Sequence, residues 1–256
     1  MKIVFVGSGN LATQLSLALK DAGKDIVQVF SRTETHAKML ADKLGCDYTA
    51  SVEAVRKDAD VYIFSVKDDA LNGLIAAVCD SRPTALFLHT AGSVAMDVFK
   101  GYAQHYGVLY PMQTFSKNRR VVFSEIPCFV EASSEADLSA VRMLAESVSC
   151  HVVDCDSEKR KKMHLAAVLA CNLTNHCYRL AERVLEREQI DFDLFLPLIE
   201  ETARKVRTLS PKEAQTGPMV RYDKSVMEMQ MAMLPDECTR EIYRLMAESI
   251  HEDCTA

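Results

Sequence analysis

The sequence predicts an α/β protein in which a doubly wound N-terminal domain precedes an all-helical domain. Over residues 1–156, short apolar runs typical of buried parallel strands alternate with helical segments. A glycine-containing turn joins the first apolar run to the first helix. From Ser157 onward only helical patterns follow. We therefore predict two domains, over residues 1–156 and 157–256.

The order of the elements supports this architecture. Continuous apolar runs predict strands over residues 2–7, 25–31, 61–66, 84–90, 106–111, 126–132 and 151–155. Helical spacing predicts helices over residues 10–23, 33–45, 68–79 and 135–148, and then over 158–188, 192–207, 220–234 and 236–252. Strands separated by helical crossovers predict a parallel sheet with helices on both faces.

Composition narrows the class of protein. The net charge of −6 argues against a nucleic-acid partner, and no apolar run has the length of a membrane span. The N-terminus lacks a signal-peptide pattern. The nine cysteines form no CxxC pair, so we predict no metal site and a reducing, cytoplasmic environment. A small-molecule substrate is the expected partner.

The turn "GSGNLA" has the G-x-G-x-x-A form of a dinucleotide-binding loop. The first glycine permits a tight turn, the second lets the backbone approach a pyrophosphate, and the helix N-terminus presents free N–H groups to the anion. We expect Gly7, Ser8, Gly9, Asn10 and Leu11 to bind the cofactor. A glycine turn without a ligand is the alternative.

The end of the second strand indicates which dinucleotide binds. An NAD site needs an acidic residue there for the ribose 2′-hydroxyl, but this chain has Ser31, Arg32 and Thr33. A guanidinium beside two hydroxyl groups suits a 2′-phosphate. We predict NADP as the cofactor; a solvent-facing arginine is the alternative.

Three further loops follow strands at the same edge of the sheet, where such folds bind ligands. Val66 and Lys67 follow one strand, and His89 and Thr90 end the next. We predict that these four residues contact the cofactor and that Gln113 contacts the substrate. We also predict a catalytic role for His89, as a donor to the nicotinamide or the substrate. A lone histidine such as His89 is alternatively a structural residue with its hydrogen bonds satisfied.

The segment Lys162–Leu180 has the apolar composition of a helix buried nearly all round. At about 100° per residue, His164, Asn172, Asn175 and His176 share one sector. Unpaired buried polar groups cost about 1–3 kcal/mol each, so they need partners or a wet cavity. We predict catalytic roles for His164 as proton donor and for both asparagines in orienting substrate, with His176 at the far wall. A hydrogen-bonded network at a domain or dimer interface is the alternative.

The stretch "QTGPMVRYD" follows in the helical half and carries two more candidate substrate ligands, Thr216 and Arg221. They could close the pocket. A helix–helix turn with a capping aspartate is the alternative interpretation.

The motifs "HTAGS", "YPMQTF", "HLAAVLACNLTNH", "PLIEETARK" and "QTGPMVRYD" resemble a bacterial family of NADP oxidoreductases, named by analogy to deazaflavin-dependent enzymes. More broadly, the chain is similar to pyrroline-5-carboxylate reductases and 3-hydroxyacid dehydrogenases. The resemblance covers essentially the whole chain. It implies a Rossmann domain and a helical domain that forms a homodimer.

One position departs from the related dehydrogenases. They carry a catalytic lysine on the first long helix of the second domain, with asparagines at following turns. Aligning Asn172 with the later asparagine places His164 at the lysine position and Val168 at the other asparagine. Histidine titrates near neutrality, so this residue type can still act as a general acid.

These observations predict an NADP(H)-dependent oxidoreductase that transfers hydride between nicotinamide and a small C=O or C=N substrate. A non-catalytic NADP(H)-binding regulator or scaffold is the alternative, supported by the missing lysine.

Overall fold

The computed structural model describes residues 1–255 of the chain. It contains two compact units, residues 1–171 and residues 172–256, and each is described by itself. The predicted domain boundary at residue 156 follows the change in secondary-structure pattern, whereas the compact units divide after Cys171. The domain boundary stays a prediction.

The first unit is built on an eight-stranded sheet in the order β3-β2-β1-β4-β5-β6-β7-β8. The strands are β1 Lys2–Val6, β2 Asp25–Phe30, β3 Asp47–Thr49, β4 Val61–Phe64, β5 Leu86–His89, β6 His105–Pro111, β7 Cys128–Ala132 and β8 Val152–Asp154. Chain order reverses at β1, which pairs in parallel with both β2 and β4. This reversal creates the crevice where doubly wound sheets bind ligands.

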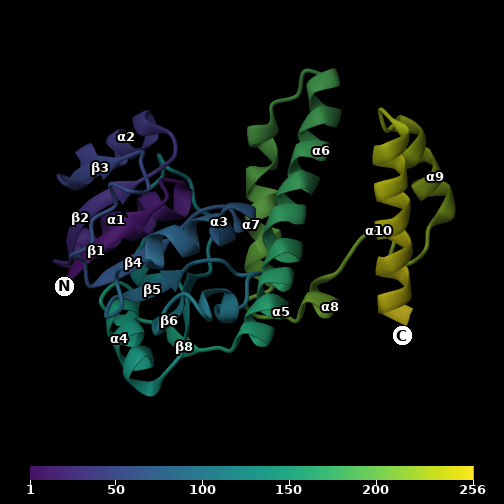
Figure 1. Ribbon diagram of the computed structural model, residues 1–256. Helices are drawn as coiled ribbons and strands as arrows, with labels where there is room; N and C mark the ends of the chain where they lie inside the picture. Colours follow the sequence, from purple (N-terminus) through teal and green to yellow (C-terminus); the bar gives the residue numbers. More distant parts are fainter. Residues whose placement is uncertain (256) are drawn as a thin grey trace. The chain divides into compact units, whose positions relative to one another are not determined.

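Helices cover both faces of this sheet (Figure 1). They are α1 Asn10–Asp21, α2 Glu34–Leu44, α3 Asp68–Cys79 and α4 Glu135–Glu146, with short 3₁₀ turns η1 Met96–Phe99 and η2 Phe123–Glu125. Alternate residues of β1 point into two separate cores. Ile3 and Phe5 pack with α1, α2 and α4, whereas Val4 and Val6 pack with α3. The predicted α/β fold with a doubly wound sheet is confirmed.

The sheet differs from the prediction in two places. β7 runs antiparallel to β6, although a parallel sheet was expected. No crossover helix separates these two strands, so the loop between them reverses the chain. The short strand β3 was not predicted because its three residues are not buried and carry no apolar run.

The helix expected over residues 158–188 consists of α5 Ser157–Ala167, the π-helical segment η3 Val168–Leu173 and α6 Thr174–Arg187. Within the single chain, this helix is not buried nearly all round as predicted. Leu165 is 61% exposed and no residue of η3 is buried. Because η3 has the i→i+5 pattern of a π-helix, the assumed 100° spacing also fails beyond Ala167. Exposed apolar helix faces are typical of subunit interfaces, but the homodimer stays a prediction.

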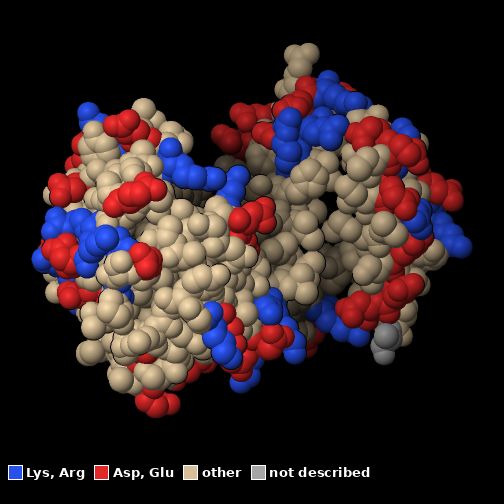
Figure 2. All heavy atoms as spheres, in the orientation of Figure 1, with Lys and Arg blue, Asp and Glu red and all other residues tan. Residues whose placement is uncertain are grey.

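The rest of the second unit is helical, as predicted. Its elements after α6 are η4 Phe192–Phe195, α7 Leu196–Lys205, α8 Pro211–Ala214, α9 Lys224–Met233 and α10 Glu237–Thr255. No helix within residues 1–255 has the length and apolar character needed to cross a membrane. Acidic and basic side chains are interspersed over the visible surface (Figure 2).

Candidate functional site

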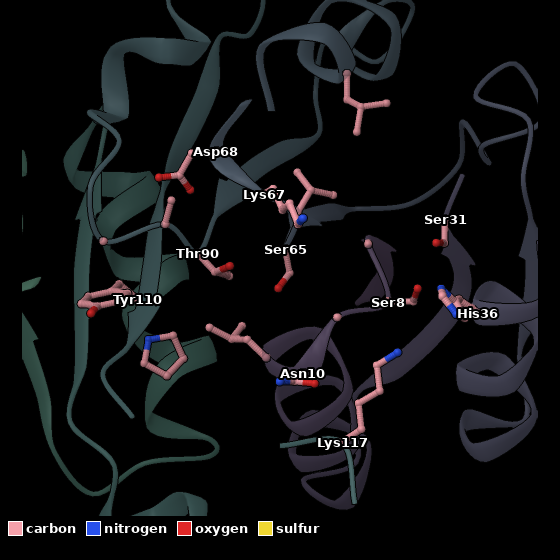
Figure 3. A pocket seen from close by; sticks show the side chains of 18 of the residues that line it. Ser8, Asn10, Ser31, His36, Ser65, Lys67, Asp68, Thr90, Tyr110 and Lys117 are labelled. Carbon is pink, nitrogen blue, oxygen red and sulfur yellow. The ribbon is translucent and has the colours of Figure 1, made fainter. Parts of the chain in front are cut away.

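A cavity of about 580 Å³ lies within the first unit at the carboxyl ends of the central strands. It is lined by Gly7, Ser8, Gly9, Asn10, Leu11, Phe30, Ser31, Arg32, Thr33, His36, Ser65, Val66, Lys67, Asp68, Leu74, Thr90, Ala91, Gly92, Ser93, Tyr110, Pro111, Gln113, Lys117 and His164. Figure 3 shows labelled side chains at or just after the carboxyl ends of β1, β4, β5 and β6, namely Ser8, Ser65, Thr90 and Tyr110, around one common space. The cavity therefore occupies the crevice that the strand order creates.

The glycine turn after β1 forms the floor of the cavity. Gly7 has φ +123°, and a Cβ there would lie 2.2 Å from the Ser65 carbonyl oxygen, so only glycine fits. Its N–H donates to the Phe30 carbonyl at 2.8 Å, which ties the turn to β2. Gly9 caps α1 without a side-chain hydrogen bond, which leaves the first helical N–H groups available. Such a helix start is suited to an anion.

Residues at the end of β2 add positive charge to one side of the cavity. Ser31, Arg32 and Thr33 line it together with His36 from the first turns of α2. Within residues 1–255, Arg32 makes no salt bridge to a carboxylate. Among the described residues that line the cavity, Asp68 is the one with an acidic side chain, and it accepts a hydrogen bond from the Ser93 hydroxyl group. This arrangement suits a phosphate better than an unmodified ribose.

A tyrosine and a histidine meet at the other side of the cavity. The Tyr110 hydroxyl oxygen lies 3.0 Å from His164 Nδ1, and the two rings meet edge to face. Tyr110 comes from the end of β6 and is 7% exposed. Burial raises the pKa of Tyr110, and the positive charge of Arg160 opposes that rise. The hydroxyl group therefore stays protonated at neutral pH.

Gly92 leaves the space that His164 occupies. A Cβ at this position would lie 2.6 Å from both Cγ and Nδ1 of His164. Van der Waals contact between such atoms requires about 3.5–4.0 Å, so any larger residue would displace the imidazole. The loop after β5 and the helix α5 thus fit together at this glycine.

One turn earlier on α5, Arg160 anchors the helix. The guanidinium is completely buried and donates to Glu131 on β7 at 2.5 Å and to the Val94 carbonyl oxygen at 2.5 Å. The Ser157 hydroxyl group also donates to Glu131, at 2.8 Å. Buried charges need partners of this kind. The anchor holds α5 against both β7 and the loop that contains Gly92, and so fixes the position of His164.

Most of the predicted site residues lie together. The cavity is lined by His164 and Gln113 and by the expected cofactor ligands Gly7, Ser8, Gly9, Asn10, Leu11, Ser31, Arg32, Thr33, Val66, Lys67 and Thr90. Their roles are taken up below as proposals.

His89 requires a correction, because it does not line the cavity. Its side chain is completely buried and stacks on Phe99, with 5.8 Å between the ring centroids. Nδ1 accepts a hydrogen bond from the Ala91 N–H at 3.2 Å. Burial, with the nearby charge of Arg160, lowers the pKa of His89 to about 3. The buried imidazole holds the following loop through Nδ1, which agrees with a structural residue, although its Nε2 is buried without a hydrogen-bond partner within residues 1–255.

The remaining predicted residues belong to the second unit. Asn172, Asn175 and His176 are exposed on η3 and α6. Thr216 is also exposed, and Arg221 pairs with Asp223 at 2.9 Å. Their roles toward substrate stay predictions.

The lining residues that sequence reasoning did not single out include Tyr110, His36 and Lys117. Tyr110 had a usable signal, because it ends a strand whose carboxyl end meets the ligand edge. His36 is on the solvent side of an ordinary helical pattern. Lys117 lies in a loop, and no periodicity there indicates which way a side chain points.

The fold and the cavity define a Rossmann-type nucleotide-binding protein with a helical second half. Residues 2–89 match the family described as "NADP oxidoreductase coenzyme F420-dependent", and residues 126–250 match a domain of unknown function, DUF2520. A solved "putative NADP oxidoreductase" from Bacteroides fragilis is 49% identical, with 98% of each chain covered and a TM-score of 0.96. The chain belongs to this NADP oxidoreductase family, which confirms the resemblance seen in the sequence.

More distant solved structures share the fold. An imine reductase from Myxococcus stipitatus in complex with NADP⁺ is 16% identical, with 98% of this chain and 92% of that chain covered and a TM-score of 0.67. A pyrroline-5-carboxylate reductase from Coxiella burnetii is 16% identical, with 99% and 97% covered and a TM-score of 0.59. The comparison with curated proteins gave no match.

Proposed function

We propose that this protein is an NADPH-dependent reductase that acts on a small C=O or C=N compound. The observation that carries the proposal is that one cavity joins two kinds of site. The glycine turn and Arg32 are suited to a phosphorylated dinucleotide, and the hydrogen-bonded pair Tyr110–His164 is suited to proton transfer. A reduction by hydride needs both.

The residues present fit NADP. The free N–H groups at the start of α1 would hold the pyrophosphate. The close packing at Gly7, where a Cβ would clash, supports this because such a turn lets the backbone approach a phosphate. Arg32, with Ser31 and Thr33, would bind the 2′-phosphate, and no carboxylate stands at the end of β2 to favour NAD. The 49% identical relative is named for the same cofactor. When bound, NADPH supplies a hydride to the substrate carbon.

Tyr110 and His164 would supply the proton that completes the reduction. Protonated at Nδ1, His164 donates to the Tyr110 oxygen, which directs the hydroxyl hydrogen to the substrate. The Tyr110 O–H bond then breaks as a bond forms to the substrate oxygen or nitrogen, and the Nδ1 proton moves to Tyr110. The C=X double bond is reduced to HC–XH. As Nδ1 releases its proton, Nε2 of His164 takes one up from solvent, so the imidazole stays neutral and changes tautomer.

The test is NADPH oxidation in the presence of a panel of imines, 2-oxoacids and aldehydes, followed by absorbance. With a substrate found, Tyr110→Phe is expected to lower kcat by about 10²- to 10⁴-fold, the usual contribution of a general acid. The Kd for NADPH should change little, because the Tyr110 hydroxyl group donates a proton to the substrate and does not bind the phosphates. Tyr102→Phe, at an exposed position outside the cavity lining, is the matched control.

Two results would contradict the proposal. NADPH that binds tightly but is oxidised with no member of the panel favours the non-catalytic alternative. An active enzyme with unchanged kcat in both Tyr110→Phe and His164→Ala would remove the pair from the chemistry.

A further inference from the structure

The segment that follows β6 is tied to the start of helix α1 by two amide side chains. Gln14 Nε2 donates to the Ser116 carbonyl oxygen at 2.7 Å, and its contact to the Lys117 carbonyl oxygen is 3.4 Å. Asn10 Nδ2 donates to the Phe115 carbonyl oxygen at 2.9 Å. Gln14 is only 3% exposed, so its hydrogen bonds are shielded from competing water. These contacts fix the backbone of an otherwise irregular loop beside the glycine turn.

This loop places the side chain of Lys117 at the cavity. Lys117 is one of its lining residues, and Figure 3 shows its side chain rising past Asn10 in the direction of Ser8 and His36. Ser31 and His36, which flank Arg32 in the sequence, lie on this same side of the cavity (Figure 3). A cation has thus been brought to the glycine turn from a point more than one hundred residues later in the chain.

Neither cation is neutralised by the protein. Within residues 1–255, neither Lys117 nor Arg32 makes a salt bridge. The third lining cation, Lys67, is also unpaired within this range, but Figure 3 shows it near Ser65 and Asp68, away from Lys117. Exposed cations elsewhere on the protein include both paired and unpaired ones. Examples of paired ones are Lys161 with Glu158 at 2.8 Å and Arg56 with Asp58 at 2.9 Å. Over the rest of the visible surface, acidic and basic side chains lie next to one another (Figure 2). Unpaired positive charge that faces a cavity favours an anionic ligand.

We propose that Lys117 is a second cation for the 2′-phosphate of NADP(H), and that Gln14 positions it. The inference rests on the cofactor of the proposed function. A phosphate monoester carries a charge of about −1.5 to −2 at pH 7, which Arg32 alone does not balance. The backbone N–H groups at the glycine turn would bind the pyrophosphate, so Lys117 is not needed there. Lys117 is therefore a residue that selects NADP over NAD.

The test measures binding and needs no substrate. Isothermal titration gives the Kd of NADPH, NADH and 2′,5′-ADP for the wild type, for Lys117→Met and for Arg119→Met. Arg119 is the matched control, because it is an exposed cation in the same turn that does not line the cavity. Lys117→Met is expected to weaken NADPH and 2′,5′-ADP about tenfold, as for one charged hydrogen bond near the surface, and to leave NADH unchanged.

The role of Gln14 is tested by a double-mutant cycle. Gln14→Leu should weaken NADPH binding in the wild-type background and have no further effect in the Lys117→Met background, because it acts through Lys117. A purely structural effect of Gln14→Leu would weaken NADH as well. If Gln14→Leu does not fold, Lys117→Met alone decides the proposal, since an exposed lysine is dispensable for folding.

Each contrary result has a distinct meaning. An equal loss of NADPH and NADH in Lys117→Met would assign the lysine to the pyrophosphate and overturn the proposal. Unchanged NADPH affinity in a protein that still prefers NADPH would overturn it while leaving the proposed function intact. A wild type that binds NADPH no better than NADH would overturn both this proposal and the choice of NADP.

Discussion

The substitution Gly92→Ala tests how His164 is held in the cavity. The new Cβ would lie 2.6 Å from Cγ and Nδ1 of His164 and 2.9 Å from its Cβ, well inside contact distance. Overpacking of this kind typically costs about 1–3 kcal/mol. Displacing the imidazole also breaks its 3.0 Å hydrogen bond to Tyr110, which costs about 1 kcal/mol more. We expect the free energy of unfolding to fall by about 2–4 kcal/mol.

Urea unfolding measures this loss, and two further variants identify its cause. In the background of His164→Ala, the two ring contacts are gone and only the 2.9 Å contact to the Cβ of residue 164 remains, so Gly92→Ala should cost less. Gly73→Ala is the matched control, because Gly73 lies inside α3 with no atom within 4 Å of its added Cβ. Alanine is the better helix former, so this change should stabilise the protein by about 0.5–1 kcal/mol. The same penalty for Gly92→Ala with and without the imidazole would refute the packing argument.

Two further predictions concern buried charge near the site. Burial lowers the pKa of His89 from 6.5 to about 3, so unfolding takes up a proton between those pH values and stability present at pH 7 is lost as the pH falls through that window. His89→Phe keeps a ring against Phe99 and should remove this loss of stability, which is on the order of 4 kcal/mol at the low-pH end. Urea unfolding across this pH range measures the effect. Equal pH slopes for the wild type and the variant would contradict the prediction. Glu131→Gln leaves the buried guanidinium of Arg160 without its carboxylate and should lower the free energy of unfolding by about 3 kcal/mol in the same assay. The exposed change Glu158→Gln is its control and should have little effect, so equal losses would be inconsistent with a buried ion pair.

The fold of the first unit followed from local patterns. The first strand could be placed because its residues 3–6 are all apolar, and the glycine turn after it has a backbone geometry at Gly7 that only glycine adopts readily. The direction of β7 could not be predicted, since strand direction depends on the connection and not on composition. The π-helical segment also leaves no clear trace in the apolar pattern.

Only the part of the candidate site that the strand order positions could be predicted from the sequence. Residues next to the turn and at strand ends, such as Arg32 and Gln113, are placed by the topology of the sheet alone. The partner of His164 is not, because Tyr110 lies 54 residues earlier and the two meet only through packing of α5. The prediction that the helix around Leu165 is buried agreed least with the structure. The apolar composition around Leu165 indicated a buried helix, but composition does not tell which element, if any, covers a given face.

The most direct test of the account is a crystal structure of the protein with NADP⁺ bound. We predict the 2′-phosphate against Arg32 and the nicotinamide ring on the side of the cavity lined by Tyr110 and His164, with space for a small substrate between the ring and the Tyr110 hydroxyl group. A nicotinamide that points away from this pair, or a dinucleotide bound outside the cavity, would contradict the proposed chemistry.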